Sequence, residues 1–73
     1  MKRIPIHSSN ILSVGYDESL ELLEIEFHDG RIYLYSNVPL PLYSQLMTAS
    51  SHGKFFAREI RAKPHLYPYV RIL

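Results

Sequence analysis

Residues 23–35, LEIEFHDGRIYLY, decide the fold of this chain. Apolar and acidic side chains alternate over the first five positions, and bulky apolar and aromatic side chains fill the last four. Asp29-Gly30 stands between them, and such a pair indicates a tight hairpin because glycine tolerates the positive φ that these turns require. The alternation is typical of half-buried strands. This stretch therefore predicts two antiparallel strands joined by a short loop.

The loop of this hairpin can have two lengths, and a change of one residue in register moves every side chain of the second strand to the opposite face. With a two-residue loop, Ile32 and Leu34 would join the core and the two neighbouring tyrosines would be displayed. With a three-residue loop that ends in a glycine bulge, Tyr33 and Tyr35 would face the core instead. The residues of the hairpin leave both registers open.

Outward from the hairpin, the same alternation recurs in residues 11–17, ILSVGYD, and predicts a preceding strand. Leu12, Val14 and Tyr16 would share one face of it. The strands expected over 11–17, 22–28 and 31–38 form a three-stranded antiparallel β-meander.

Two short helices are expected after the meander. Pro39 and Pro41 force an extended segment and then start the first helix, because proline suits the first helical position. Ser51 can cap a second helix over residues 53–62. Pro64 and Pro68 predict an extended or irregular tail. The chain is thus expected to be one α+β domain over residues 1–73, with both helices packed on one face of the meander and an extended C-terminal tail.

Length and composition limit the classes of protein that fit. A chain of 73 residues buries only roughly 60% of the surface that its unfolded form exposes, so its core is thin. It contains no cysteine, which excludes disulfides and thiolate metal sites and favours a reducing compartment. No apolar run approaches the ~18 residues of a membrane span. We therefore expect a cytoplasmic protein that does not bind membranes.

The charges are sorted along the chain although they nearly cancel, at a net charge of +1. Every charged residue from position 11 to position 30 is acidic, and six of the seven from position 31 onward are basic. Such a distribution creates a dipole whose basic end can attract a polyanion. Ordinary solvated faces would explain the same charges, and both interpretations stay open.

The predicted second helix carries the densest basic cluster. At 100° per residue, Lys54, Arg58 and Arg61 form a stripe roughly opposite the apolar side, and Phe55 lies at its edge. With a helix start capped by Ser51, this pattern is typical of a surface that binds phosphates and bases. An amphipathic helix whose polar face happens to be basic is the alternative.

Catalytic and metal chemistry find little support in the residues. The hydroxyls next to His7 have no glycine-framed turn and no acid at an informative spacing. His28, His52 and His65 show no ligand spacing of a metal site. We therefore expect no enzyme activity, no catalytic or metal-binding residue, no cofactor and no small-molecule substrate.

Taken in order, several short motifs resemble the KTSC family, small domains found at the C-terminus of some lysyl-tRNA synthetases and as stand-alone bacterial proteins. The resemblance covers roughly residues 8–61 and resumes over 67–71. Its motifs YxY, VP and SxGxxF are met by Tyr33 and Tyr35, by Val38 and Pro39, and by Ser51, Gly53 and Phe56. It implies that these are structural residues and that no catalytic residue is present.

The resemblance also bears on the hairpin register and on function. The family often has a polar residue at position 34, which favours the register with Tyr33 and Tyr35 facing the core. Leu34 departs from that pattern and, with Ile32, would leave an apolar strip on the outer face of the sheet. RNA binding is the activity that the synthetase context suggests.

Two functional hypotheses follow. The first is a non-enzymatic nucleic-acid-binding module for single-stranded or structured RNA, with Phe55 stacking on bases and phosphates contacted by Lys54, Arg58, Arg61, Arg31 and Arg71. The second is a protein-interaction module, such as a homodimer that pairs apolar sheet faces or matches acidic and basic ends.

Overall fold

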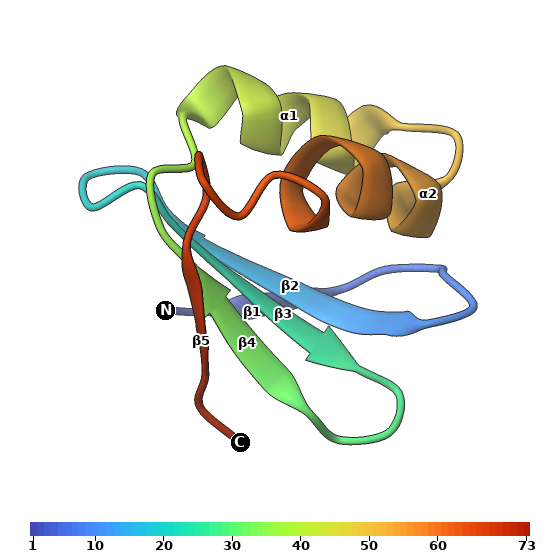
Figure 1. Cartoon of the computed structure of the whole chain (residues 1–73). Helices are drawn as coiled ribbons and strands as arrows, with labels where there is room; N and C mark the ends of the chain where they lie inside the picture. The colour runs from blue at the N-terminus through green and yellow to red at the C-terminus, as the bar shows by residue number, and fades with distance from the viewer.

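The computed structural model describes all 73 residues, as a five-stranded antiparallel sheet with helices on one face (Figure 1). The strands are β1 (Arg3–Pro5), β2 (Ile11–Asp17), β3 (Leu22–Phe27), β4 (Ile32–Tyr35) and β5 (Tyr69–Arg71). The helices are α1 (Leu40–Thr48), α2 (His52–Phe56) and the π-helical η1 (Ala57–Arg61). Neighbouring strands in the sequence are neighbours in the sheet, so the architecture is an extended meander.

The hairpin between β3 and β4 has the three-residue loop. Phe27 and Arg31 are joined by a backbone hydrogen bond of 2.9 Å, and Gly30 has a φ of 92°. The register therefore places Tyr35 beside Leu23 and Tyr33 beside Ile25, on the inner face that the helices cover. This is the register that the family resemblance favours.

The expectation that Leu12 shares one face of its strand with Val14 and Tyr16 was wrong. A β-bulge between Ile11 and Ser13 shifts the register of β2 against β3. Ile11 and Val14 are both fully buried as a result, whereas Leu12 is 39% exposed. An extra residue at a bulge changes the face of everything before it, and strict alternation does not reveal this.

The predicted α+β class is confirmed, but the prediction of three strands and a tail outside the sheet was wrong, because the sheet has five strands. β1 pairs with β2 and β5 pairs with β4, and both are three-residue edge strands. Pro5 lies on the edge strand β1, where a missing N–H costs nothing. Pro68 precedes β5 and uses its carbonyl, which accepts a 2.8 Å hydrogen bond from the Ser36 N–H.

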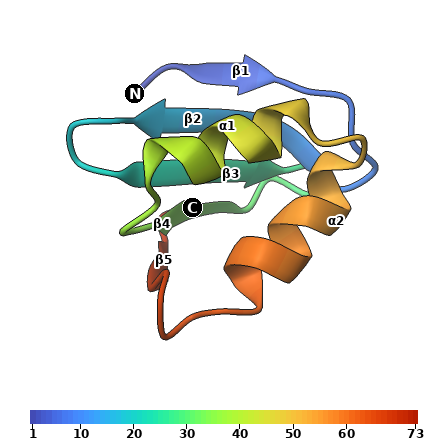
Figure 2. The ribbon, with the colours of Figure 1, turned by 90° about the horizontal axis from the view of Figure 1, so that it is seen from above.

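The helices close the inner face of the sheet (Figure 2). Ser51 caps α2 as predicted, since its Oγ accepts a hydrogen bond from the Lys54 N–H at 3.3 Å. The predicted single helix over residues 53–62 continues from α2 into a π-helical turn at Ala57. No helix is long and apolar enough to span a bilayer. The core joins both layers and contains Ile11, Val14, Leu23, Ile25, Phe27, Tyr35, Val38, Leu46, Phe56 and Ile60.

Candidate nucleic-acid interface

A cavity of about 320 Å³ opens where η1 and the segment after it face β4 and β5. We call it the tyrosine–arginine cavity. Aromatic rings and two guanidinium-bearing side chains dominate its lining, which consists of Phe27, Arg31, Tyr33, Tyr35, Arg61, Pro64 and Tyr69.

The aromatic wall of the cavity results from the register of β4 and β5. Tyr35 lies opposite Tyr69 in this pair, so both side chains project from the inner face beside Tyr33. The ring centroids of Tyr69 lie 5.5 Å from Tyr33 and 5.6 Å from Tyr35. Behind this wall, the edge of Phe56 meets the Tyr35 ring at 5.2 Å and 82°. Tyr69 remains 51% exposed and forms the outer rim.

The hydroxyl group of Tyr35 has no protein partner. Only 2% of this residue is exposed, and none of the side-chain hydrogen bonds in the structure involves it. No polar side-chain atom that is sealed from solvent lacks a partner, so this hydroxyl reaches the cavity. Burial raises the pKa of Tyr35 to about 12, partly opposed by the nearby charge of Arg61. The hydroxyl is therefore protonated at neutral pH and can donate a hydrogen bond into the cavity.

Three arginines surround the cavity. The Arg31 Cζ lies 5.6 Å from the ring centroid of Phe27, and its Nε donates to Asp29 Oδ2 at 2.7 Å. The Arg61 Cζ lies 5.8 Å from the centroid of Phe56, and Arg61 makes no ion pair in the structure. Arg71 is opposite Tyr33 in the sheet. Hydrogen bonds from the backbone N–H and then the side chain of Arg31, with the charge of Arg71 beyond, lower the pKa of Asp29.

The π-helical turn decides which basic residues meet. A π-helix has i→i+5 hydrogen bonds and more residues per turn, so it advances less than 100° per residue. Arg61 therefore falls out of the predicted stripe and turns toward the cavity. The structure thus brings Arg61 together with Arg31 and separates it from Lys54 and Arg58.

The other predicted binding residues lie elsewhere. Lys54 and Ser51 line a separate polar cleft of about 450 Å³, opposite the loop that carries Ser8 and Asn10. Arg58 lies over Phe55, with its Cζ 5.8 Å from the ring centroid, and donates to Glu59. Phe55 packs partly against the core, which limits the area of its ring that could stack on a base.

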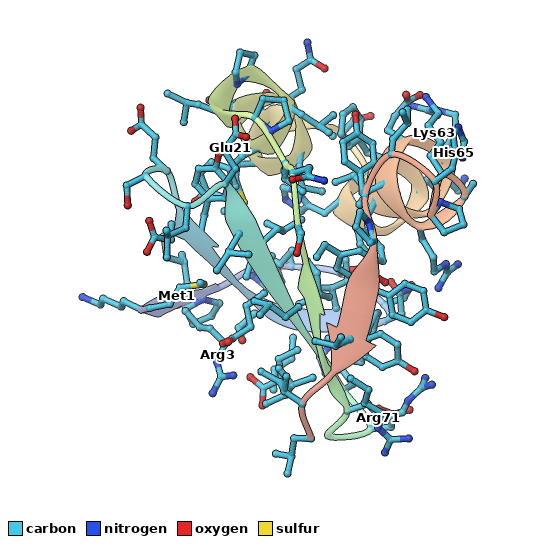
Figure 3. All side chains as sticks on the ribbon, turned by 60° about the vertical axis from the view of Figure 1, so that its left-hand side comes forward. Met1, Arg3, Glu21, Lys63, His65 and Arg71 are labelled. Atoms are coloured by element: carbon cyan, nitrogen blue, oxygen red, sulfur yellow. The ribbon has the colours of Figure 1, made fainter.

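Five of the seven acidic residues lie on β2, on β3 or in the turn between them, whereas Asp29 follows β3 and Glu59 lies on η1. Arg3 ties Glu24 and Glu26 to the outer face, at 2.8 Å and 3.9 Å. The β2–β3 hairpin carries further acids, and Figure 3 shows its Glu21 at the opposite end of the molecule from Arg71. The acidic residues of β2, β3 and their hairpin therefore lie apart from the arginines of the cavity, although Arg3 is paired with two of them.

Sequence reasoning treated the YxY tyrosines and Phe56 as structural and did not propose Phe27, Pro64 or Tyr69 as site residues. The tyrosines are structural by burial and also line the cavity. A signal was present, since a YxY strand paired with YPYVR in antiparallel register stacks three tyrosines on one face. Reading it required the knowledge that the tail is a strand.

Fold and site together define a small α+β domain with an arginine-rimmed aromatic cavity at one edge of its covered sheet face. The family model described as the KTSC domain matches residues 7–63. This chain belongs to the KTSC domain family.

Relatives support this assignment along the whole chain. An uncharacterized protein of Stutzerimonas stutzeri is 40% identical over 72 residues, which cover 99% of each chain. The crystal structure of a KTSC domain protein from Yersinia pestis is similar with a TM-score of 0.88 and 38% identity, and covers 99% of this chain and 97% of that one. A lysine–tRNA ligase of Trichormus variabilis is 34% identical over 55 residues, 75% of this chain but only 10% of the ligase.

The structure explains the SxGxxF motif of the family physically. Ser51 caps α2, and Phe56 is fully buried in the core. At Gly53, a Cβ atom would lie 2.5 Å from Asn10 Oδ1 and 3.2 Å from Ser8 Oγ. Glycine therefore lets the helix lie against these two side chains, whereas a Cβ would force the Asn10 side chain to move.

Proposed function

We propose that this domain binds single-stranded RNA through the tyrosine–arginine cavity and its rim. Arg31, Arg61 and Arg71 contact phosphates, and Tyr69 stacks on a base. The observation that carries the proposal is an aromatic cavity lined by the side chains of Arg31 and Arg61, with Arg71 nearby, opposite Tyr33 in the sheet.

The arrangement favours a single strand over a duplex. Guanidinium groups recognise phosphates, and their planes and aromatic rings stack on bases. Duplex bases are already stacked on each other, whereas unpaired bases can turn outward onto a protein ring. The similarity to a segment of a lysine–tRNA ligase supports RNA as the nucleic acid. We place this non-enzymatic activity in the cytoplasm, where RNA is present and the absence of cysteine is unremarkable.

Fluorescence anisotropy of a labelled oligouridylate tests the proposal across a range of salt concentrations. Three phosphate contacts predict that the log of affinity falls with the log of salt with a slope near about −2 for a single strand. The triple variant R31Q/R61Q/R71Q should lose most of the affinity and flatten that slope. Absence of binding at low salt would overturn the proposal.

A second triple variant, K2Q/K54Q/R58Q, is the matched control because it also removes three positive charges. It should keep most of the slope if the phosphates lie at the cavity. A larger loss in this control would place the interface on the originally predicted helix stripe and refute the cavity as its centre.

Self-association is a second candidate function, favoured by the outer face of the sheet. Ile32 is largely buried, because its backbone pairs with Ile72 and Leu73. The exposed apolar strip on this face therefore consists of Leu34, Val70 and Ile72. Val70 and Ile72 are 57% and 48% exposed. Light scattering after gel filtration tests this idea, since a dimer that becomes monomeric in V70E/I72E would support it and a strict monomer at high concentration would contradict it.

A further inference from the structure

We propose that the tyrosine–arginine cavity is a pocket for one nucleotide unit, with its phosphate held by Arg31 and Arg61 and a base acceptor atom bonded to the Tyr35 hydroxyl. The inference deepens the proposed RNA binding and rests on it. It names the residues that would bind one nucleotide, whereas the proposed function concerns the binding of a whole RNA strand.

The unpartnered hydroxyl of Tyr35 is the first observation that indicates a ligand. The hydroxyl is not sealed from solvent, so its hydrogen-bond partner must come from the cavity, as water or as a ligand. The Tyr35 ring is held in place by the edge contact with Phe56, so its hydroxyl is fixed in direction. Because it stays protonated, it can donate to an acceptor such as a base carbonyl or ring nitrogen.

The two guanidinium groups are the second observation. Arg31 and Arg61 come from different elements and line the same cavity. Arg61 has no carboxylate partner, and Arg31 has one on an exposed loop, Asp29. A phosphate between them would accept charge-assisted hydrogen bonds, for which arginine is well suited.

The size and lining of the cavity are the third observation. Its volume of about 320 Å³ lies near the lower end of the range of small-molecule pockets. The rings of Phe27, Tyr33 and Tyr69 supply flat apolar surface, and Pro64 adds an edge. Such a pocket suits a planar base joined to an anion, and an inorganic anion alone would leave the rings and the Tyr35 hydroxyl without a function.

Residue-resolved NMR titration of the full chain with uridine 5′-monophosphate tests the pocket directly. Amide shifts should concentrate on residues 31–35, 60–64 and 69–71. Uridine and inorganic phosphate, titrated separately, should each bind at least tenfold more weakly than the nucleotide. Equal binding of phosphate alone would overturn the pocket and reduce the site to an anion site, and shifts centred elsewhere would overturn it as well.

Tyr35→Phe removes only the hydroxyl and should weaken nucleotide binding roughly three- to tenfold, the loss of one hydrogen bond. Tyr43→Phe is the matched control, since Tyr43 stacks on Tyr16 away from the cavity, and it should leave the affinity unchanged. An unchanged affinity in Y35F would overturn the assignment of the hydroxyl.

The oligouridylate titration separates this inference from the proposed function. If the oligomer binds with the expected salt dependence but the mononucleotide does not enter the cavity, RNA binding stands and the pocket is refuted. If the mononucleotide occupies the cavity but the oligomer does not bind, the pocket stands as a site for free nucleotides and RNA binding is refuted. Absence of both refutes both.

Discussion

Two tyrosines flank Leu23 in the same row of the sheet, Tyr16 on β2 and Tyr35 on β4, and their surroundings are opposite. The Tyr16 hydroxyl donates to the Val38 carbonyl at 2.6 Å, and its ring stacks on Tyr43 at 4.2 Å and 6°. The Tyr35 hydroxyl meets no protein group and points to a cavity. One side of β3 is closed by α1, and the other side is left open beside η1.

The difference shows that the same residue type can have a structural role on one side of a strand, as Tyr16 does, and line a candidate site on the other, as Tyr35 does. Burial raises the pKa of both tyrosines, so burial alone does not separate them. The separation lies in hydrogen bonding and in the neighbouring charge, because acids cluster near Tyr16 and arginines near Tyr35. A site can therefore be recognised where the fold leaves a polar group without a protein partner at the surface of a cavity.

The largest expected effect is the loss of stability on truncating Phe56, which packs behind Tyr35 on the cavity side of β3. Phe56 is fully buried against Tyr35 and Phe27. Phe56→Ala should lower the free energy of unfolding by about 3 to 5 kcal/mol, through lost burial and the cavity that remains. Urea unfolding followed by circular dichroism measures this loss. Phe56→Leu is the control that retains most of the volume, and a loss as large as that of alanine would contradict the packing explanation.

The second-largest expected effect is a loss of stability at high pH, to which Tyr35 contributes through its raised pKa. The pKa of Tyr35 is about 12 in the folded protein against 10.0 for an unperturbed tyrosine, about a hundredfold difference in proton affinity. The folded state therefore keeps a proton that the unfolded state loses, so stability is fully present below pH 10 and falls as pH rises toward 12.

Tyrosinate absorbance, followed against pH together with urea stability, measures this effect. Tyr35→Phe should lose the latest step of the titration and show a shallower decline of stability from pH 10 to 12. Tyr16 contributes a decline of the same sign in both proteins, since its pKa is also raised. If Y35F instead loses a step near pH 10 and keeps the latest step, the Tyr35 hydroxyl is freely solvated and this prediction is wrong.

The paired substitutions Tyr16→Phe and Tyr35→Phe should have unequal effects on stability. Tyr16→Phe deprives the buried Val38 carbonyl of its donor and should cost about 1 to 3 kcal/mol. Tyr35→Phe removes a group without a protein partner and should change stability by less than about 0.5 kcal/mol. Urea midpoints at neutral pH compare them, and equal losses would mean that both hydroxyls are satisfied in the folded state.

The sequence could predict the local part of this fold and only some of the site. Asp29-Gly30 indicated the hairpin, and Ser51 marked the start of the second helix, because these signals depend on the turn or cap itself. The bulge that turns Leu12 outward and the pairing of Tyr69 with Tyr35 depend on distant partners. They carry no local signature, and three-residue edge strands have little alternation to detect.

The site was predicted incompletely for a similar reason. Arg31, Arg61 and Arg71 were named as candidates from their charge, but the stripe model grouped Arg61 with Lys54 on the assumption of 100° per residue. The π-helical η1, which begins at Ala57, advances by a smaller angle per residue. The absence of a protein partner for the Tyr35 hydroxyl could not be predicted, since it depends on how the tail and η1 pack around the cavity.

The smallest expected effect is a gain in RNA affinity from Asp29→Asn. Asp29 Oδ2 holds the Arg31 side chain at 2.7 Å and competes with a phosphate for it. Its lowered pKa keeps Asp29 ionised at neutral pH, where the measurement is made. Asparagine retains an Oδ1 to accept from the Arg31 N–H, so the turn should persist while the competing charge is lost. Anisotropy with the labelled oligouridylate at low salt should show binding about two- to fivefold tighter.

Asp17→Asn is the matched control for this gain, because it makes the same charge change in the other hairpin. Asp17 Oδ1 accepts from the Leu20 N–H much as Asp29 Oδ1 accepts from Arg31, and asparagine can keep that bond. Both variants raise the net charge by one, so a general attraction to RNA would strengthen equally in each. A gain confined to D29N would place the phosphate beside Arg31, whereas equal gains would show that the two ends of β3 are electrostatically equivalent to RNA.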